Sequence, residues 1–130
     1  MYYYTYMLRC EDNSIYTGMT NNLEKRINEH IEKDKNCAKY TKTHNVVKLE
    51  SAWRSKDKSL ACKLEYQIKQ LTKKQKEDLI NGEKISKYLK GKIDARKNRC
   101  KEISKNIILE NFKKSRYNLY ENCREKPTNK

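Results

Sequence analysis

A β-hairpin that leads directly into a helix limits the folds open to this chain. Residues 3–10 and 15–19 are rich in tyrosine and other β-favouring residues and predict two strands. Residues 11–14, between them, have the Asp and Asn content of a tight turn. Thr20 to Asn22 then offers an N-cap for a helix over residues 23–32. The apolar positions of that helix recur every four residues: Leu23, Ile27 and Ile31.

The pattern continues with one more strand and two more helices. Residues 33–44 are polar and predict a loop, and period-two alternation over residues 46–53 predicts a third strand. Helical spacing covers residues 58–71, and a capping box at Thr72 starts a short helix that ends near residues 81–82. The predicted fold is α/β (α+β), with a small, three-stranded, mostly antiparallel sheet flanked by helices.

The character of the chain changes after residue 82. We therefore expect a domain over residues 1–82 and a basic, helical C-terminal extension over 83–130, whose last residues are disordered. Residues 1–80 hold 16 basic and 11 acidic residues (net +5), and residues 81–130 hold 15 and 6 (net +9). The extension is expected to supply affinity for a polyanion, or to be a solvated stabilising helix; a dimer formed through it stays open. Its apolar stripe comprises Ile85, Leu89, Ile93, Cys100, Ile103 and Ile107.

The overall charge favours nucleic acid as a partner. Lys and Arg total 31 among 130 residues, against 17 Asp and Glu, which gives a net charge of +14. Such a field attracts polyanions and makes association dependent on salt. Two alternatives remain: coding bias in an AT-rich genome, and an RNA-binding protein that uses the basic tail.

Several classes of protein are disfavoured. The five cysteines are an odd number, and no pair has zinc-finger spacing, which argues against a disulfide scaffold or a zinc module. The N-terminus lacks the basic and apolar regions of a signal peptide, and no apolar run is long enough to span a membrane. We expect a cytoplasmic or nucleoid-associated (or nuclear) protein, neither secreted nor in a membrane.

Five side chains are candidates for chemistry. Strand alternation places Tyr6 on one face of the first strand and Tyr16 on one face of the second, near Gly18, whose missing side chain leaves room for a phosphate. If both phenols share a face, they flank one spot; the alternative is aromatic packing within the sheet. Arg26 and His30 lie on one side of the first helix and are expected to flank its apolar stripe. The alternative is that they only solvate its border.

Glu65 is the fifth candidate. It lies in an otherwise apolar helix face, in line with Ala61 and Ile68. A buried carboxylate must be paired or must hold a cation, because burying it alone is costly. An internal salt bridge with Arg26 is the alternative to a metal site.

Together these residues resemble the GIY-YIG nuclease family. Tyr4-Thr5-Tyr6 stands at the first motif and Tyr16-Thr17-Gly18 at the second, followed in family order by Arg26, His30 and Glu65. The resemblance covers residues 3 to about 80 and is closest to the small stand-alone members. Their further patterns are matched by Tyr6-Met7-Leu8-Arg9-Cys10, Asp12, Leu23-Glu24-Lys25-Arg26, Ala38-Lys39-Tyr40-Thr41 and Glu65 through Lys76.

The resemblance implies metal-dependent hydrolysis of DNA phosphodiesters. Glu65 would hold a single Mg²⁺ or Mn²⁺, Tyr16 would act as general base or position the water, and Tyr6 would orient the phosphate or the water. Arg26 would clamp phosphate oxygens, and His30 would share proton transfer or contact phosphate. Gly18, Lys25, Lys39 and Lys69 are expected to contact the substrate. Whether the role is DNA repair, recombination or mobile-element spread stays open.

The chain also departs from the family pattern. Tyr4 stands where the first motif usually has Gly, and Thr17 where the second often has Ile. The extension lacks the Cys/His-rich zinc module of related resolvase subunits. A catalytically silent nucleic-acid-binding module that keeps the fold is the main alternative to an enzyme.

Overall fold

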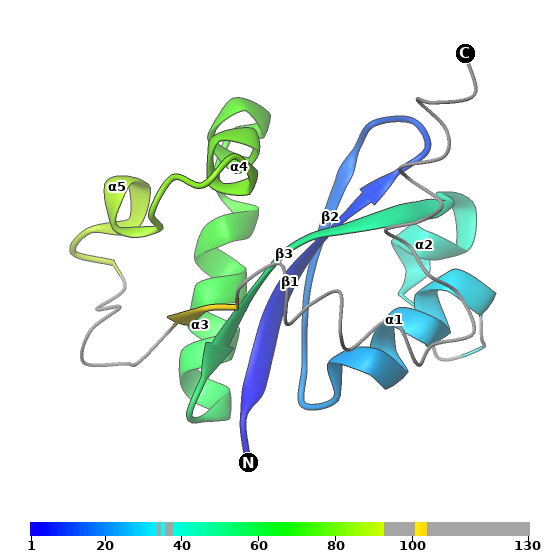
Figure 1. Ribbon diagram of the computed structural model, residues 1–130, viewed down its shortest axis with the longest axis horizontal. Helices are drawn as coiled ribbons and strands as arrows, with labels where there is room; N and C mark the ends of the chain where they lie inside the picture. Colours follow the sequence, from blue (N-terminus) through cyan, green and yellow to red (C-terminus); the bar gives the residue numbers. More distant parts are fainter. Residues whose placement is uncertain (34, 36–37, 93–100, 104–130) are drawn as a thin grey trace.

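An antiparallel sheet lies between two groups of helices in the computed structural model (Figure 1), which describes residues 1–33, 35, 38–92 and 101–103. Helices α1 and α2 cover one face, and α3, α4 and α5 cover the other. The elements, in chain order, are β1 (Tyr3–Cys10), β2 (Ile15–Thr20), α1 (Leu23–Glu32), α2 (Lys39–Thr43), β3 (Val46–Ser55), α3 (Lys58–Lys69), α4 (Lys73–Ile80), α5 (Ser86–Leu89) and β4 (Lys101–Glu102).

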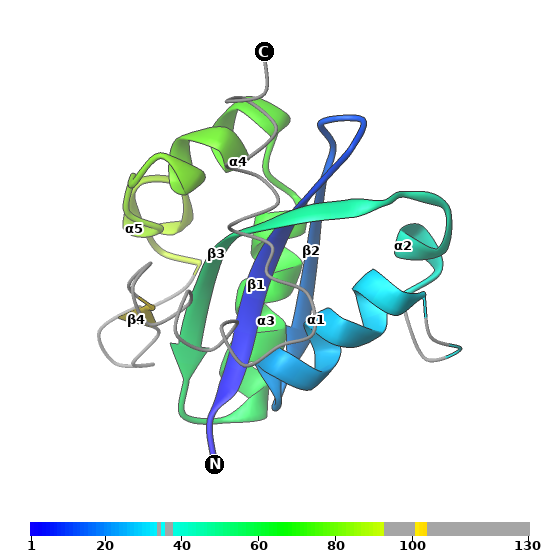
Figure 2. The same ribbon diagram turned by 45° about the vertical axis from the view of Figure 1, so that its right-hand side comes forward.

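The sheet confirms the predicted fold class and adds one short strand. Its strand order is β2-β1-β3-β4, with every neighbouring pair antiparallel. The two-residue β4 lies against the end of β3 (Figure 2). In the β1–β2 register Tyr6 opposes Gly18 and Leu8 opposes Tyr16. Directly opposed residues point to the same face, so Tyr6 and Tyr16 share the face covered by α1.

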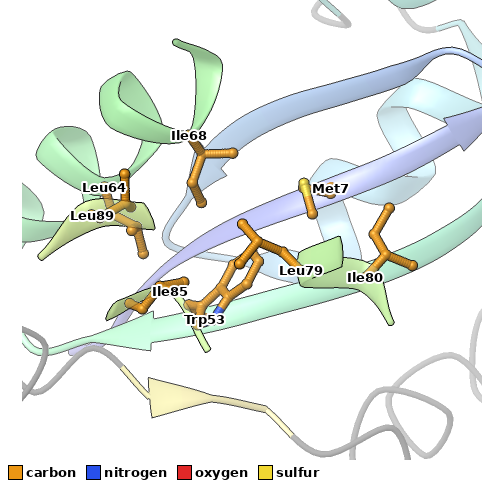
Figure 3. Close-up of a cluster of buried hydrophobic side chains, with 8 residues drawn as sticks. All are labelled: Met7, Trp53, Leu64, Ile68, Leu79, Ile80, Ile85 and Leu89. Carbon is orange, nitrogen blue, oxygen red and sulfur yellow. The ribbon is translucent and has the colours of Figure 1, made fainter. Parts of the chain in front are cut away.

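Each face of the sheet has its own buried cluster. Tyr6 and Leu8 pack with Leu23 and Ile27 of α1. On the opposite face Met7 and Trp53 pack against α3, α4 and α5 (Figure 3). The members of this second cluster are Met7, Trp53, Leu64, Ile68, Leu79, Ile80, Ile85 and Leu89.

The helix starts have the caps that the sequence indicates. The Asn22 side chain accepts from the Lys25 N–H at the start of α1. The predicted capping box is present at α4, where Thr72 and Gln75 satisfy each other's backbone N–H groups. These local contacts explain why the helix boundaries could be predicted closely.

Two predicted features of the α1 region are wrong. The segment expected to be a loop contains the five-residue helix α2. The buried face of α1 consists of Leu23, Ile27 and His30, with Ile31 only half-buried. His30 is therefore inside the protein and does not flank an apolar stripe. Hydrogen bonds to both ring nitrogens offset the cost of burying the imidazole.

The C-terminal extension is not one continuous helix where the structure describes it. Ile85 and Leu89 are buried in the second cluster, but α5 ends at Leu89 and Gly91 has φ +83°. Ile103 follows strand β4 and is buried against the Tyr6 cluster. The predicted stripe positions 93, 100 and 107, and the disordered end, lie outside the described residues. Within the described parts, none of the helices is both long and apolar enough to span a membrane.

Candidate functional site

The Tyr6 hydroxyl is the centre of a polar cluster under α1. The side chain is fully buried, and its oxygen lies 2.7 Å from His30 Nε2. Burial raises the pKa of Tyr6 well above its ordinary value, and the neighbouring Tyr16 adds to this. A hydrogen bond from Arg26, and its charge, act in the opposite direction. Tyr6 therefore keeps its proton at neutral pH.

His30 connects Tyr6 to helix α2. Its Nδ1 lies 2.8 Å from Thr41 Oγ1, and both side chains are buried. Burial, reinforced by the Arg26 charge, lowers the pKa of His30 to about 4. The imidazole is therefore neutral at pH 7 and can accept a hydrogen bond at one ring nitrogen.

Tyr16 is the partly exposed phenol of the pair. Its ring centroid lies 6.3 Å from that of Tyr6 and 5.2 Å from that of His30. Its ring also stacks on Tyr40 of α2, with centroids 5.8 Å apart and planes 23° apart. Of the two predicted catalytic tyrosines, Tyr16 is thus the one that a substrate can reach without displacing the core.

Gly18 makes room for the Tyr6 ring. A Cβ atom at position 18 would lie 2.5 Å from Tyr6 Oη and 2.7 Å from Tyr6 Cζ. Such a contact is far inside van der Waals distance. The space above this glycine, which we expected to admit a phosphate, holds the Tyr6 hydroxyl.

Arg26 and Glu65 approach the phenols from different helices. Arg26, on α1, makes a 2.7 Å ion pair with Glu29, in addition to its hydrogen bond to Tyr6. Glu65 is half-buried on α3, and its charge contributes to raising the pKa of Tyr6. Its carboxylate lies 3.4 Å from Lys69 Nζ, one helical turn away.

Of the three lysines predicted to bind substrate, one lies close to the phenols and two lie on exposed helix surfaces. The Lys69 ammonium lies 6.0 Å from the Tyr16 ring centroid, so this residue belongs to the site. Lys25 and Lys39 lie on exposed surfaces of α1 and α2. Lys76 of α4, which we did not predict, is half-buried, and its pKa is lowered by burial and by Lys69.

The site also includes two residues of α2 that sequence reasoning missed. Tyr40 stacks on Tyr16, and Thr41 binds His30. The only signal for them was the likeness of the run from Ala38 to Thr41 to the stand-alone members. Without a predicted helix there, nothing indicated that these side chains point inward.

Arg9, another motif residue, has a structural role. It makes a 2.9 Å ion pair with Glu50 of β3 and a two-pronged contact with Glu77 of α4 at 2.6 Å. These bonds raise the pKa of Arg9, chiefly through Glu77. The guanidinium thus fastens α4 to the sheet, on the face opposite the phenols.

The acidic groups of the site fit a cation bound by few protein ligands. Among the residues that the structure describes, no three His, Cys, Asp or Glu side chains gather into a metal cage. Glu65 is a single half-buried carboxylate beside the phenols. One carboxylate, with water and substrate oxygens completing the shell, suits a hard cation such as Mg²⁺.

Comparison with known proteins places this chain among relatives. The sequence profile of the GIY-YIG catalytic domain matches residues 2–78. The UPF0213 protein FN1575 of Fusobacterium nucleatum is 46% identical over 103 residues, which are 79% of this chain and 99% of that protein. The UPF0213 protein CPE1444 of Clostridium perfringens is 47% identical over 83 residues, 63% of this chain and 86% of that one.

A solved structure is also similar in sequence. The solution NMR structure of the UPF0213 protein BH0048 from Bacillus halodurans is 36% identical and covers 62% of this chain and 84% of that one, with a TM-score of 0.39. GIY-YIG domains are typically endonucleases, and nucleases of this family generally use divalent metal ions. By its profile match and its UPF0213 relatives, the chain belongs to the GIY-YIG nuclease family.

Proposed function

We propose that this protein is an endonuclease that hydrolyses DNA phosphodiester bonds with one divalent cation bound at Glu65. One observation carries the proposal: a buried Tyr6–His30 hydrogen bond lies beneath the partly exposed Tyr16, and the charges of Arg26 and Glu65 both act on the buried phenol. In this proposal these groups would supply a proton acceptor, a phosphate-binding cation and a metal ligand.

Tyr16 and Arg26 contact the substrate in this account. Tyr16 positions the attacking water, since it is the more exposed phenol. As a phenolate, a form that a neighbouring positive charge such as that of Arg26 favours, it takes the proton of that water. Arg26 binds the non-bridging oxygens of the scissile phosphate, because a guanidinium matches their geometry with two parallel N–H groups. Lys69 and Lys76 add positive charge on the α3–α4 side, where the flanking phosphates would lie.

Tyr6 and His30 support the proton transfer. His30 is neutral at pH 7 because burial lowers its pKa to about 4. It can therefore accept a hydrogen bond from the Tyr6 hydroxyl, whose oxygen in turn accepts a hydrogen bond from Arg26. A cation held by Glu65 would polarise the phosphoryl oxygen and stabilise the leaving 3′-oxygen.

The partner class follows from charge. A net charge of +14 favours polyanions such as DNA or RNA over neutral and basic ligands. We assign DNA as the substrate from the family, and a role in DNA repair or recombination, inside the cell and close to the nucleoid, is part of the proposal.

The proposal is tested with a panel of labelled nucleic acids. Duplex, single-stranded, flap and junction DNAs, with an RNA of matched sequence, are incubated with the full-length protein in Mg²⁺, Mn²⁺ or EDTA. We expect cation-dependent internal cleavage of at least one DNA, abolished by EDTA. Binding without cleavage of any substrate would contradict the proposal and favour a silent binding module; cleavage of RNA alone would correct the substrate class.

A further inference from the structure

We infer that Thr41 is a positioning residue that fixes the tautomer of His30, so that the Tyr6 hydroxyl donates to His30 and leaves its own oxygen open to Arg26. The inference deepens the proposed function, on which its catalytic meaning rests. It assigns a role to a residue of α2 that acts through His30.

The tautomer follows from counting hydrogen-bond donors. Thr41 Oγ1 has one hydrogen, and it donates to the Ala38 carbonyl oxygen at 3.1 Å. At its 2.8 Å contact with His30 Nδ1 the hydroxyl can therefore only accept. His30 then carries its proton on Nδ1, and Nε2 is an acceptor. The 2.7 Å contact between Nε2 and Tyr6 Oη must be a donation from the phenol.

The reverse arrangement satisfies these buried groups less well. If Thr41 donated to Nδ1, the proton of His30 would move to Nε2 and point at Tyr6 Oη. That oxygen would then accept from both His30 and Arg26. The Tyr6 proton would need a further buried acceptor, and an unmade buried hydrogen bond is costly.

Helix α2 is held firmly enough to select one arrangement. Lys33, in the left-handed conformation after α1, places its ammonium 2.8 Å from the Thr41 carbonyl oxygen and 3.1 Å from that of Lys42. Tyr40, also on α2, stacks on both Tyr16 and His44, with 3.9 Å between the Tyr40 and His44 centroids. One short helix therefore orients His30 through Thr41 and Tyr16 through Tyr40.

The test uses the full-length protein with three single substitutions. Thr41→Val keeps the shape and removes the hydroxyl, Thr41→Ser restores the hydroxyl, and Thr43→Val is the matched control. Thr43 lies on the same helix but is exposed, and its hydroxyl bonds to the Tyr40 carbonyl oxygen. Nitrogen NMR of histidine-labelled protein reports the His30 tautomer at neutral pH, and single-turnover cleavage of the best DNA substrate reports the rate.

We expect Nδ1–H in the wild type, in Thr41→Ser and in Thr43→Val, and a mixture with Nε2–H in Thr41→Val. The cleavage rate of Thr41→Val should fall about 10–100-fold, by analogy with the loss seen when a bond that orients a metal-bound histidine is removed. A Thr41→Val protein with an unchanged His30 tautomer, or with a changed tautomer and the wild-type rate, would overturn the inference. If neither the wild type nor any variant cleaves DNA, the proposed function fails. The NMR result is separate: an unchanged His30 tautomer in Thr41→Val would overturn the role of Thr41 in orienting His30, whatever the cleavage result.

Discussion

At the scale of single residues, burial gives two identical phenols different environments. Tyr6 is fully buried, hydrogen-bonded to His30 and held in its protonated form. Tyr16 is partly exposed on the neighbouring strand, within 6.3 Å of the Tyr6 ring centroid. Alternation along the strands predicts that both share a face, but it cannot predict which of them is exposed, since that depends on how α1 and α2 cover the sheet.

The hydroxyl of Tyr16 is therefore expected to matter for the rate and little for stability. Tyr16→Phe keeps the ring and its stacking on Tyr40, and we expect single-turnover cleavage to fall about 100-fold or more with a near-unchanged melting temperature. Tyr66→Phe, at an exposed tyrosine of α3, is the control and should cut at the wild-type rate. Full activity in Tyr16→Phe would leave this phenol a packing residue and remove it from the chemistry.

The burial of His30 should make folding sensitive to mild acid. Its pKa is about 4 in the folded protein, against about 6.5 in an unfolded chain. The unfolded state therefore binds the extra proton first, and the stability present above pH 6.5 is lost as the pH falls toward 4. His30 alone should lower the free energy of unfolding by about 3 kcal/mol between pH 7 and pH 4.

Urea unfolding at several pH values checks this expectation. His30→Gln should flatten the dependence between pH 6.5 and 4.5, a window above the range in which the lowered pKa values of Asp12, Glu77 and Asp78 take effect. His44→Gln, at a partly exposed histidine, should retain it. An identical slope in wild type and His30→Gln would show that the imidazole titrates as it does in the unfolded chain.

At the scale of elements, local signals predicted those parts whose stability is local. The boundaries of α1 follow from its Asn22 cap and its apolar spacing, and those of α4 from its capping box. Helix α2 could not be predicted, because its five residues lack an apolar period and a side-chain cap. It is held by contacts from elsewhere: the Thr41–His30 bond and the Lys33 ammonium on its last carbonyls.

The close pairing of β1 and β2 gives a further prediction. Gly18→Ala should lower the free energy of unfolding by about 1–3 kcal/mol, because its Cβ would overlap the Tyr6 hydroxyl and ring. Removing that hydroxyl relieves part of the overlap. Gly18→Ala should therefore cost less in a Tyr6→Phe background than in wild type, and purely additive losses in the double-mutant cycle would contradict this origin.

At the scale of the whole molecule, the described part of the extension packs against the domain. Ile85 and Leu89 complete the cluster around Trp53, and Ile103 packs with the cluster around Tyr6. The alignment with the Fusobacterium nucleatum relative spans 103 residues and therefore extends beyond residues 1–82. The apolar spacing identified these positions as buried, but not that a glycine and a strand would divide the predicted helix.

A chain that ends at Gly82 is therefore expected to be less stable than one that ends at Ile103. Each buried Ile or Leu contributes about 1.5–3 kcal/mol, so losing Ile85, Leu89 and Ile103 should lower the urea midpoint strongly or leave the shorter chain unfolded. Equal midpoints for the two chains would confirm a domain boundary at residue 82 and assign the extension to affinity alone.

Two glutamates with similar local surroundings provide the most direct test of the proposed nuclease site. Glu65 and Glu83 each pair with the lysine four residues on, at 3.4 and 3.3 Å, but of the two only Glu65 lies beside Tyr6 and Tyr16. The measurement is the single-turnover rate of DNA cleavage in Mg²⁺ for Glu65→Ala and Glu83→Ala, with DNA affinity measured in parallel. The account predicts background cleavage with retained binding for Glu65→Ala and the wild-type rate for Glu83→Ala; a Glu65→Ala protein that cuts as fast as wild type would contradict it.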